Sequence, residues 1–292
     1  MSFLILLSLA LAPAVFFFYF FWIRDRWEKE PWSLLLMLAF WGGISVIPVG
    51  IVELAFFPKG LEFESVSDAV KVAFLCAGLI EEGAKFLFVY FLTLTSVHFR
   101  EEYDGIIYAV AVGLGFAAVE NVFYVISAML SGEGALSIAL MRAFTAVPMH
   151  ALDGVILGFF IGRARFMKDG MSKFIMNMTG LILAIVFHGL YDMFAFLTIV
   201  LPQEMIGWCI VGLVWTMVVQ WGTAQKMVAA AQRRSHGQHS WSSTVTAASV
   251  AVQTSPVATA EIKTFMRRFC RFCGKPVNPE SKFCTNCGSK LR

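Results

Sequence analysis

The chain has little charge for its length. Only 15% of its 292 residues are Asp, Glu, Lys or Arg, whereas 58% are hydrophobic, and the mean hydropathy is +0.72. Soluble globular proteins carry about a quarter charged residues, so the composition excludes that class, and its apolar content also excludes intrinsic disorder. Cysteine is scarce as well. Of the six present, four lie between Cys270 and Cys287, which excludes a disulfide framework for the rest of the chain.

The sequence contains several long apolar runs. A run of about 20 apolar residues is long enough to cross a bilayer as a helix. We predict seven such spans, at about 3–23, 32–57, 69–95, 105–130, 138–162, 174–201 and 206–225. The first has no basic segment before it and is too long for a cleaved signal peptide. The sequence therefore predicts an all-α polytopic membrane protein.

Basic residues are unevenly distributed. Residues 1–221 carry a net charge of −6 and residues 222–292 carry +9. The loops after the first, third and fifth spans hold Arg24, Arg26, Lys29, Arg100, Arg163, Arg165, Lys168 and Lys173, whereas the opposite loops hold only Lys59. The positive-inside rule then predicts an N-terminus outside the cell and a C-terminal tail in the cytoplasm.

The tail divides into two parts, and we expect a membrane domain over residues 1–231. Residues 232–265 are rich in Ser, Thr and Ala and are predicted to form a flexible linker. Residues 266–292 contain two CxxC pairs, which supply four thiolates to one tetrahedral zinc: Cys270, Cys273, Cys284 and Cys287. Gly274 and Gly288 suit the positive-φ turns of such a site.

We expect this zinc to be structural, because four cysteines leave no open position for water or substrate. The module resembles the short zinc ribbons appended to many prokaryotic membrane proteins. Its basic residues suit contact with a cytoplasmic protein, nucleic acid or anionic lipid: Arg267, Arg268, Arg271, Lys275, Lys282 and Lys290.

Ionisable residues interrupt four of the predicted spans near their midpoints. An ionisable group at that depth costs ~2.5–3.5 kcal/mol even on the lenient insertion scale. The residues are Glu81, Glu82 and Lys85 in the third span, Glu120 in the fourth, His150 in the fifth, and His188 and Asp192 in the sixth. Because four helices place them at one depth, we predict a shared site. Glu53 and Arg142 lie near span ends, where snorkelling accounts for them.

Spacing within each helix predicts pairs. Lys85 lies one turn from both Glu81 and Glu82 and can neutralise either carboxylate. The i,i+4 spacing of His188 and Asp192, and the i,i+3 spacing of His150 and Asp153, would let an aspartate fix the tautomer of an imidazole.

Such a set suits peptide hydrolysis inside the membrane. A buried carboxylate can act as general base for water, and imidazoles can polarise a carbonyl or stabilise an oxyanion. The HExxH, GxGD and GxSG motifs of other intramembrane proteases are absent. A catalytic zinc held by two histidines and a glutamate stays open as an alternative.

Three motifs, in order on successive spans, carry a family resemblance. EExxK at Glu81–Lys85, FxxxE at Phe116–Glu120 and HxxxD at His188–Asp192 resemble the PrsW family of intramembrane proteases, which is related to the CAAX prenyl-protease and bacteriocin-processing group. The resemblance covers about residues 30–200. It implies a protease that clips membrane-anchored substrates, notably anti-sigma factors.

The same resemblance implies roles for individual residues. Glu81 and Glu82 would activate water, and Glu120, His150 and His188 would complete the site. The prenyl-protease relatives carry His and Asn where this chain has Glu120 and Asp192, which argues against a prenylated substrate. The zinc ribbon lies beyond the family pattern.

Two other functions remain open on the sequence alone. Intramembrane Glu, His and Asp residues also form the proton and ion pathways of coupled transporters. Many such transporters contain inverted repeats, and we find none in this sequence. A non-enzymatic scaffold that recruits partners through its zinc ribbon would use the same polar residues only for helix packing.

Overall fold

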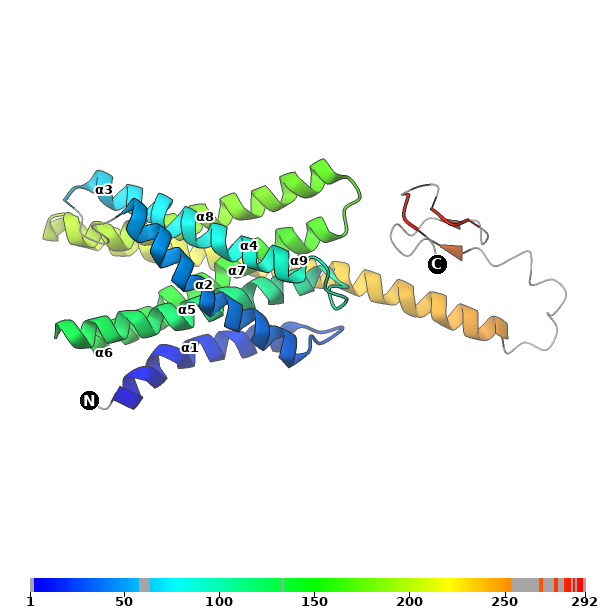
Figure 1. Cartoon of the computed structure of the whole chain (residues 1–292), viewed down its shortest axis with the longest axis horizontal. Helices are drawn as coiled ribbons and strands as arrows, with labels where there is room; N and C mark the ends of the chain where they lie inside the picture. Colours follow the sequence, from blue (N-terminus) through cyan, green and yellow to red (C-terminus); the bar gives the residue numbers. More distant parts are fainter. Residues whose placement is uncertain are drawn as a thin grey trace.

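The computed structural model describes residues 3–57, 64–132, 134–253, 268–269, 276–277, 281–284, 286 and 288–290. Its main body is a bundle of helices (Figure 1). In chain order they are α1 (Phe3–Arg24), α2 (Trp32–Phe56), α3 (Val66–Lys71), the π-helix η1 (Val72–Glu81), α4 (Glu82–Thr93), α5 (Glu102–Ser131), α6 (Ala135–Phe144), α7 (Ala146–Arg165), α8 (Gly170–Val200), the 3₁₀ turn η2 (Gln203–Met205) and α9 (Ile206–Gln253).

Six helical segments in the described part of the chain are long and apolar enough to cross a membrane: Phe3–Arg24, Trp32–Phe56, Glu102–Ser131, Ala135–Arg165, Gly170–Val200 and Gln203–Ser235. The all-α membrane architecture is thereby confirmed. The predicted span over 69–95 corresponds to α3, η1 and α4, which follow one another directly. It is not among the six, because the π-helix divides it into three short segments.

The π-helix lies at the start of the EExxK motif. It ends at Glu81, and α4 begins at Glu82. A π-helix bonds i to i+5 and so contains more residues per turn than an α-helix, which rotates everything that follows it around the helix axis. Gly78 within η1 lies against α8, where an added Cβ would be 3.1 Å from the Ile185 carbonyl oxygen. The π-helix therefore sets the orientation of the two glutamates toward α8.

Helix α5 forms the centre of the bundle. Its first half is buried on every side, and it packs most extensively against α7 and α2. Small residues allow this approach: a Cβ at Gly158 of α7 would lie 2.2 Å from the Gly105 carbonyl oxygen, and one at Gly162 would lie 2.2 Å from that of Glu102. Without a hydrophobic driving force between helices in lipid, such close backbone packing holds membrane helices together.

The tail is described only in part. Strands β1 (Arg268–Phe269) and β2 (Pro276–Val277) pair antiparallel. Gly288 adopts φ +70°, as its sequence position predicts, and its N–H donates to the Cys284 carbonyl at 2.8 Å. Cys284 is buried. Cys270, Cys273, Cys287 and Gly274 lie outside the described residues.

The predicted linker differs from the structure over its first part. Helix α9 continues to Gln253 and so covers residues 232–253 of the segment predicted as flexible, whereas 254–265 lie outside the described residues. The run of good helix formers from Lys226 to Arg234 gives the helix no reason to end at the membrane surface.

The α5–α7 contact gives a stability prediction. We expect Gly158→Ala to lower the thermal midpoint of the detergent-solubilised protein by several degrees, because the new Cβ collides with backbone and overpacking costs about 1–3 kcal/mol. Gly222→Ala in α9 is the control, since a Cβ there meets nothing within 4 Å. Equal thermal midpoints for the two variants would show that α5 and α7 do not depend on this contact.

Candidate functional site

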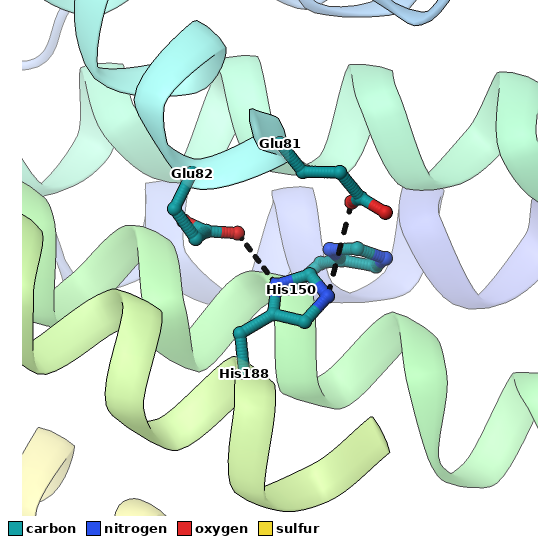
Figure 2. Close-up of side chains that lie close together, drawn as sticks. All are labelled: Glu81, Glu82, His150 and His188. Carbon is teal, nitrogen blue, oxygen red and sulfur yellow. Dashed lines mark hydrogen bonds and ion pairs between the residues drawn. The ribbon is translucent and has the colours of Figure 1, made fainter. Parts of the chain in front are cut away.

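Four side chains from three parts of the chain meet inside the bundle. Glu81 ends η1, Glu82 begins α4, His150 lies on α7 and His188 lies on α8. All four are buried, and one ligand atom from each lies within 4.8 Å of the others. Figure 2 shows their side chains turned toward one another. The structure thus brings together the residues that the sequence places at one membrane depth.

Lys85 connects this cluster. Its Nζ lies 3.1 Å from Glu81 Oε2, 2.7 Å from Glu82 Oε1 and 2.9 Å from His150 Nδ1. The first two contacts are the ion pairs that the spacing predicts, and both form at once. Nζ also lies 4.2 Å from the centre of the Phe116 ring, a cation–π contact that accounts for the phenylalanine of the FxxxE motif.

The contacts of His150 define its tautomer. Nδ1 faces the Lys85 ammonium, which can only donate, so Nδ1 accepts. Nε2 therefore carries the proton and donates to Glu120 Oε2 at 2.9 Å. The predicted pairing of His150 with Asp153 is wrong. His150 turns toward α4 and α5, and Asp153 faces α8, because the rotation of α7 directs the two side chains to different neighbours.

His188 lies among carboxylates. Its Nδ1 is 2.7 Å from Glu82 Oε1 and 3.6 Å from Asp153 Oδ2. Its Nε2 is 3.2 Å from Asp192 Oδ2, so the pair predicted within α8 forms, and 3.8 Å from Glu81 Oε2. Both ring nitrogens face acceptors, which is the hydrogen-bonding pattern of an imidazolium.

Arg142 belongs to this site, contrary to the sequence prediction. It is buried, with one terminal nitrogen 2.7 Å from Glu120 Oε2, and its Nε donates to Asn121 Oδ1 at 2.7 Å. Its guanidinium also lies 3.9 Å from the centre of the Tyr124 ring. The prediction failed because α6 begins at Ala135, earlier than expected, so Arg142 lies deeper in the bundle than a snorkelling residue would.

A second missed residue comes from the last span. Gln220 of α9 is fully buried, and its Nε2 donates to Asp153 Oδ1 at 2.5 Å. It thereby holds the aspartate that faces His188. The only signal in the sequence is an uncharged amide within an apolar run, which does not separate it from a helix-packing residue.

The donor set has the composition of a metal site, since two imidazoles and two carboxylates are ligands that zinc accepts. The Lys85 ammonium, however, already lies within 3.1 Å of Glu81, Glu82 and His150. A zinc ion bound to these three atoms would have to displace the ammonium, because the atoms already accept from it and the two cations would repel each other at that distance. In this arrangement, therefore, the residues do not fit a catalytic metal.

Comparison with known proteins identifies two families. Residues 30–223 match the model of the family described as PrsW family intramembrane metalloprotease, and residues 269–291 match a zinc-ribbon domain. No solved structure matches the chain.

Curated relatives give the same assignment. Protease PrsW of Bacillus subtilis is 34% identical over 188 residues, which cover 64% of this chain and 81% of the relative. Protease PrsW of Geobacillus kaustophilus is 33% identical over 187 residues, covering 64% and 78%. That of Clostridioides difficile is 34% identical over 175 residues, covering 59% and 72%.

The family assignment decides between the functions that the sequence left open. It supports a peptidase over a transporter or a scaffold, as the order of the three motifs indicates. With its membrane helices, its motif residues gathered at one buried site and a zinc ribbon at its C-terminus, the chain belongs to the PrsW family of intramembrane proteases.

Proposed function

We propose that the chain hydrolyses peptide bonds of membrane-anchored proteins within the bilayer, using a water molecule activated by glutamate and no metal ion. The observation that carries this proposal is the position of Lys85, whose ammonium forms ion pairs with two adjacent glutamates where a metal would otherwise lie. A second observation supports it: Glu82 Oε2 is buried without a hydrogen-bond partner among the described residues, and so can accept from water.

The two glutamates have different roles in this proposal. Glu82 makes two contacts of 2.7 Å, with Lys85 and His188, which stabilise its ionised form and hold it in place. Glu81 makes longer contacts, of 3.1 Å to Lys85 and 3.8 Å to His188, and is the more accessible of the two. We therefore assign general-base catalysis to Glu81, and to Glu82 the orientation of Lys85, His188 and the attacking water.

The histidines act on the substrate carbonyl. Water attacks the carbonyl carbon as its proton passes to Glu81. The His188 Nε2–H, which faces Asp192 before the substrate binds, then donates to the oxyanion that forms. When the C–N bond breaks, Glu81 returns the proton to the leaving amine. His150, held between Lys85 and Glu120, keeps Lys85 in position, and Asp192 and Asp153 keep the His188 ring oriented.

The substrate must unwind before it is cut, because the amides of a membrane helix are already hydrogen-bonded to one another. We therefore propose single-span proteins with helix-destabilising residues near the cleavage point, in regulatory proteolysis of the anti-sigma-factor kind. In the full chain, residues 1–231 form the protease domain, 232–265 connect it to the ribbon at 266–292, and the ribbon lies in the cytoplasm.

The first prediction from this proposal separates the roles of the two glutamates. We expect Glu81→Gln and Glu82→Gln each to lower kcat on a reconstituted single-span substrate by about 10²–10⁴-fold. Glu82→Gln should also lower the thermal midpoint more than Glu81→Gln does, because it removes the shared partner of Lys85 and His188. Both quantities are measured on purified protein, by gel-based cleavage and by thermal unfolding in detergent.

Glu102→Gln is the matched control for these variants, since Glu102 is a buried glutamate at the start of α5 that pairs with Arg234 and lies outside the cluster. It should cleave the substrate at the wild-type rate. Retained cleavage in Glu81→Gln would overturn the assignment of Glu81 as general base.

The second prediction concerns Arg142, which we propose as a positioning residue that acts through Glu120 and His150. Arg142→Gln should lower kcat by about 10²-fold, as expected for misplacement of a catalytic group, and leave KM unchanged. Arg142→Lys should recover part of the loss, because it restores the charge but not the hydrogen bond to Asn121. Arg100→Gln is the control, since Arg100 lies outside the site and forms an ion pair of 2.5 Å with Glu28. A rise in KM with kcat unchanged would contradict this role.

The third prediction tests the absence of a catalytic metal. Elemental analysis of purified wild type should find one zinc per chain, and replacement of Cys270, Cys273, Cys284 and Cys287 by Ser should remove it while cleavage continues. A metal that remains in the Ser variant and disappears on adding His188→Ala would place it in the membrane site and refute the metal-free mechanism.

A further inference from the structure

A pocket with basic and apolar lining lies apart from the site. It lies at the end of the bundle where α4 and α7 end and α8 begins; Figure 1 shows these helix ends. Its volume is about 90 Å³, room for several water-sized groups. It is lined by Tyr90, Thr93, Leu94, Phe99, Ile161, Ala164, Arg165, Lys173 and Asn177. Arg165 ends one candidate membrane span and Lys173 lies in the first turn of the next, which places the pocket at headgroup depth.

Two cations line this pocket, and neither forms an ion pair with a described carboxylate. Arg165 is held in place through one terminal nitrogen, which donates to the Leu94 carbonyl at 2.7 Å, and its guanidinium lies 5.4 Å from the centre of the Phe99 ring. Lys173 is half-buried beside it. Asp169 precedes α8 but does not line the pocket, and it accepts instead from the Ser172 N–H. The pocket therefore has positive charge that the described part of the chain does not balance.

An amide oxygen in the same wall also lacks a partner. Asn177 lies one turn after Lys173 on α8 and is 92% buried, as its exposed fraction is 8%. Its Oδ1 has no hydrogen-bond partner among the described residues. Leaving a buried acceptor unpaired is unfavourable, so a ligand that donates a hydrogen bond here would be favoured. These features favour an anion that also carries a hydrogen-bond donor as the ligand of the pocket.

The surroundings indicate that this ligand is a lipid. On both helices a large apolar side chain that follows a lining residue in the sequence is exposed, with Phe91 of α4 at 65% and Phe174 of α8 at 60%, as expected for surface that contacts acyl chains. Basic pockets between membrane helices at headgroup depth bind anionic lipids. A soluble anion would gain nothing from this apolar rim.

We propose that the pocket formed by Arg165, Lys173 and Asn177 binds an anionic phospholipid with a hydroxyl-bearing headgroup, of the phosphatidylglycerol class. The phosphodiester accepts from the two cations, a headgroup hydroxyl donates to Asn177 Oδ1, and the acyl chains lie along Phe91 and Phe174. The lipid then bridges α4, which carries Glu82 and Lys85 of the EExxK motif, to the α7–α8 hairpin, which carries both site histidines.

Native mass spectrometry of the full chain released from nanodiscs tests this proposal. The nanodiscs contain equal amounts of phosphatidylglycerol and phosphatidylcholine, and the readout is the ratio of the two lipids that stay bound. Wild type should retain phosphatidylglycerol preferentially. Lys173→Gln should lower the ratio about fivefold, which corresponds to ~1 kcal/mol per cation at a lipid surface. Asn177→Asp, of the same size but negatively charged, should lower it at least as much.

Lys168→Gln is the matched control, because Lys168 is an exposed lysine of the loop that joins α7 to α8 and does not line the pocket. Its ratio should stay within twofold of wild type. The proposal fails if Lys173→Gln retains phosphatidylglycerol as wild type does, or if Lys168→Gln loses as much as Lys173→Gln. It also fails if inorganic phosphate raises the thermal midpoint in detergent as much as phosphatidylglycerol does, since the ligand would then be a soluble anion. The Lys173 side chain makes no hydrogen bond or ion pair with a described residue, so its variant carries the test even if Asn177→Asp unfolds.

Discussion

Two adjacent carboxylates in a bundle that spans a membrane repel each other, and the ion pairs that Lys85 makes with both of them allow the rest of the site to form. Lys85 lies one turn from Glu81 and Glu82 on the same helix, so helix geometry alone supplies the neutralising charge. Burying a charge is tolerated only when it is paired and hydrogen-bonded. Every other contact of the site extends from this unit.

From Lys85 the network extends through His150 to Glu120 and on to Arg142, and from Glu82 through His188 to Asp192 and Asp153. Each contact along both branches joins a donor to an acceptor, so each carboxylate of the network has at least one donor or cation beside it. Such a network is held rigidly only if the helices that carry it cannot slide. The glycine contacts between α5 and α7 meet this requirement, because they fix the backbone separation of the helices that carry Glu120 and His150.

The same arrangement explains how a member of a family described as metalloproteases can have a site in which a lysine ammonium contacts the side chains that could bind a metal. Imidazole and carboxylate groups bind either a divalent cation or an ammonium, and which cation they bind depends on the reach of neighbouring side chains. Here Lys85 lies one helical turn from Glu81 and Glu82 and over the Phe116 ring. Its ammonium is therefore within hydrogen-bond distance of three of the four potential metal ligands. The charge that a metal would bring is supplied by the chain itself.

The sequence by itself determined the features that depend on composition and on spacing along one helix. Apolar runs predicted the membrane helices, and i,i+3 or i,i+4 spacing predicted the Lys85 and His188–Asp192 pairs, because helix periodicity places such residues on one face whatever the helix packs against. The positive φ of Gly288 was predicted in the same way, because the turn after a CxxC pair requires a local conformation that glycine adopts readily. The tertiary structure alone decided which helices face each other and how each is rotated. It turned His150 away from Asp153, brought Arg142 and Gln220 into the network, and inserted the π-helix before Glu82. These depend on helix rotation and depth in the bundle, which are set by packing among segments distant in the chain and leave no pattern in any one of them.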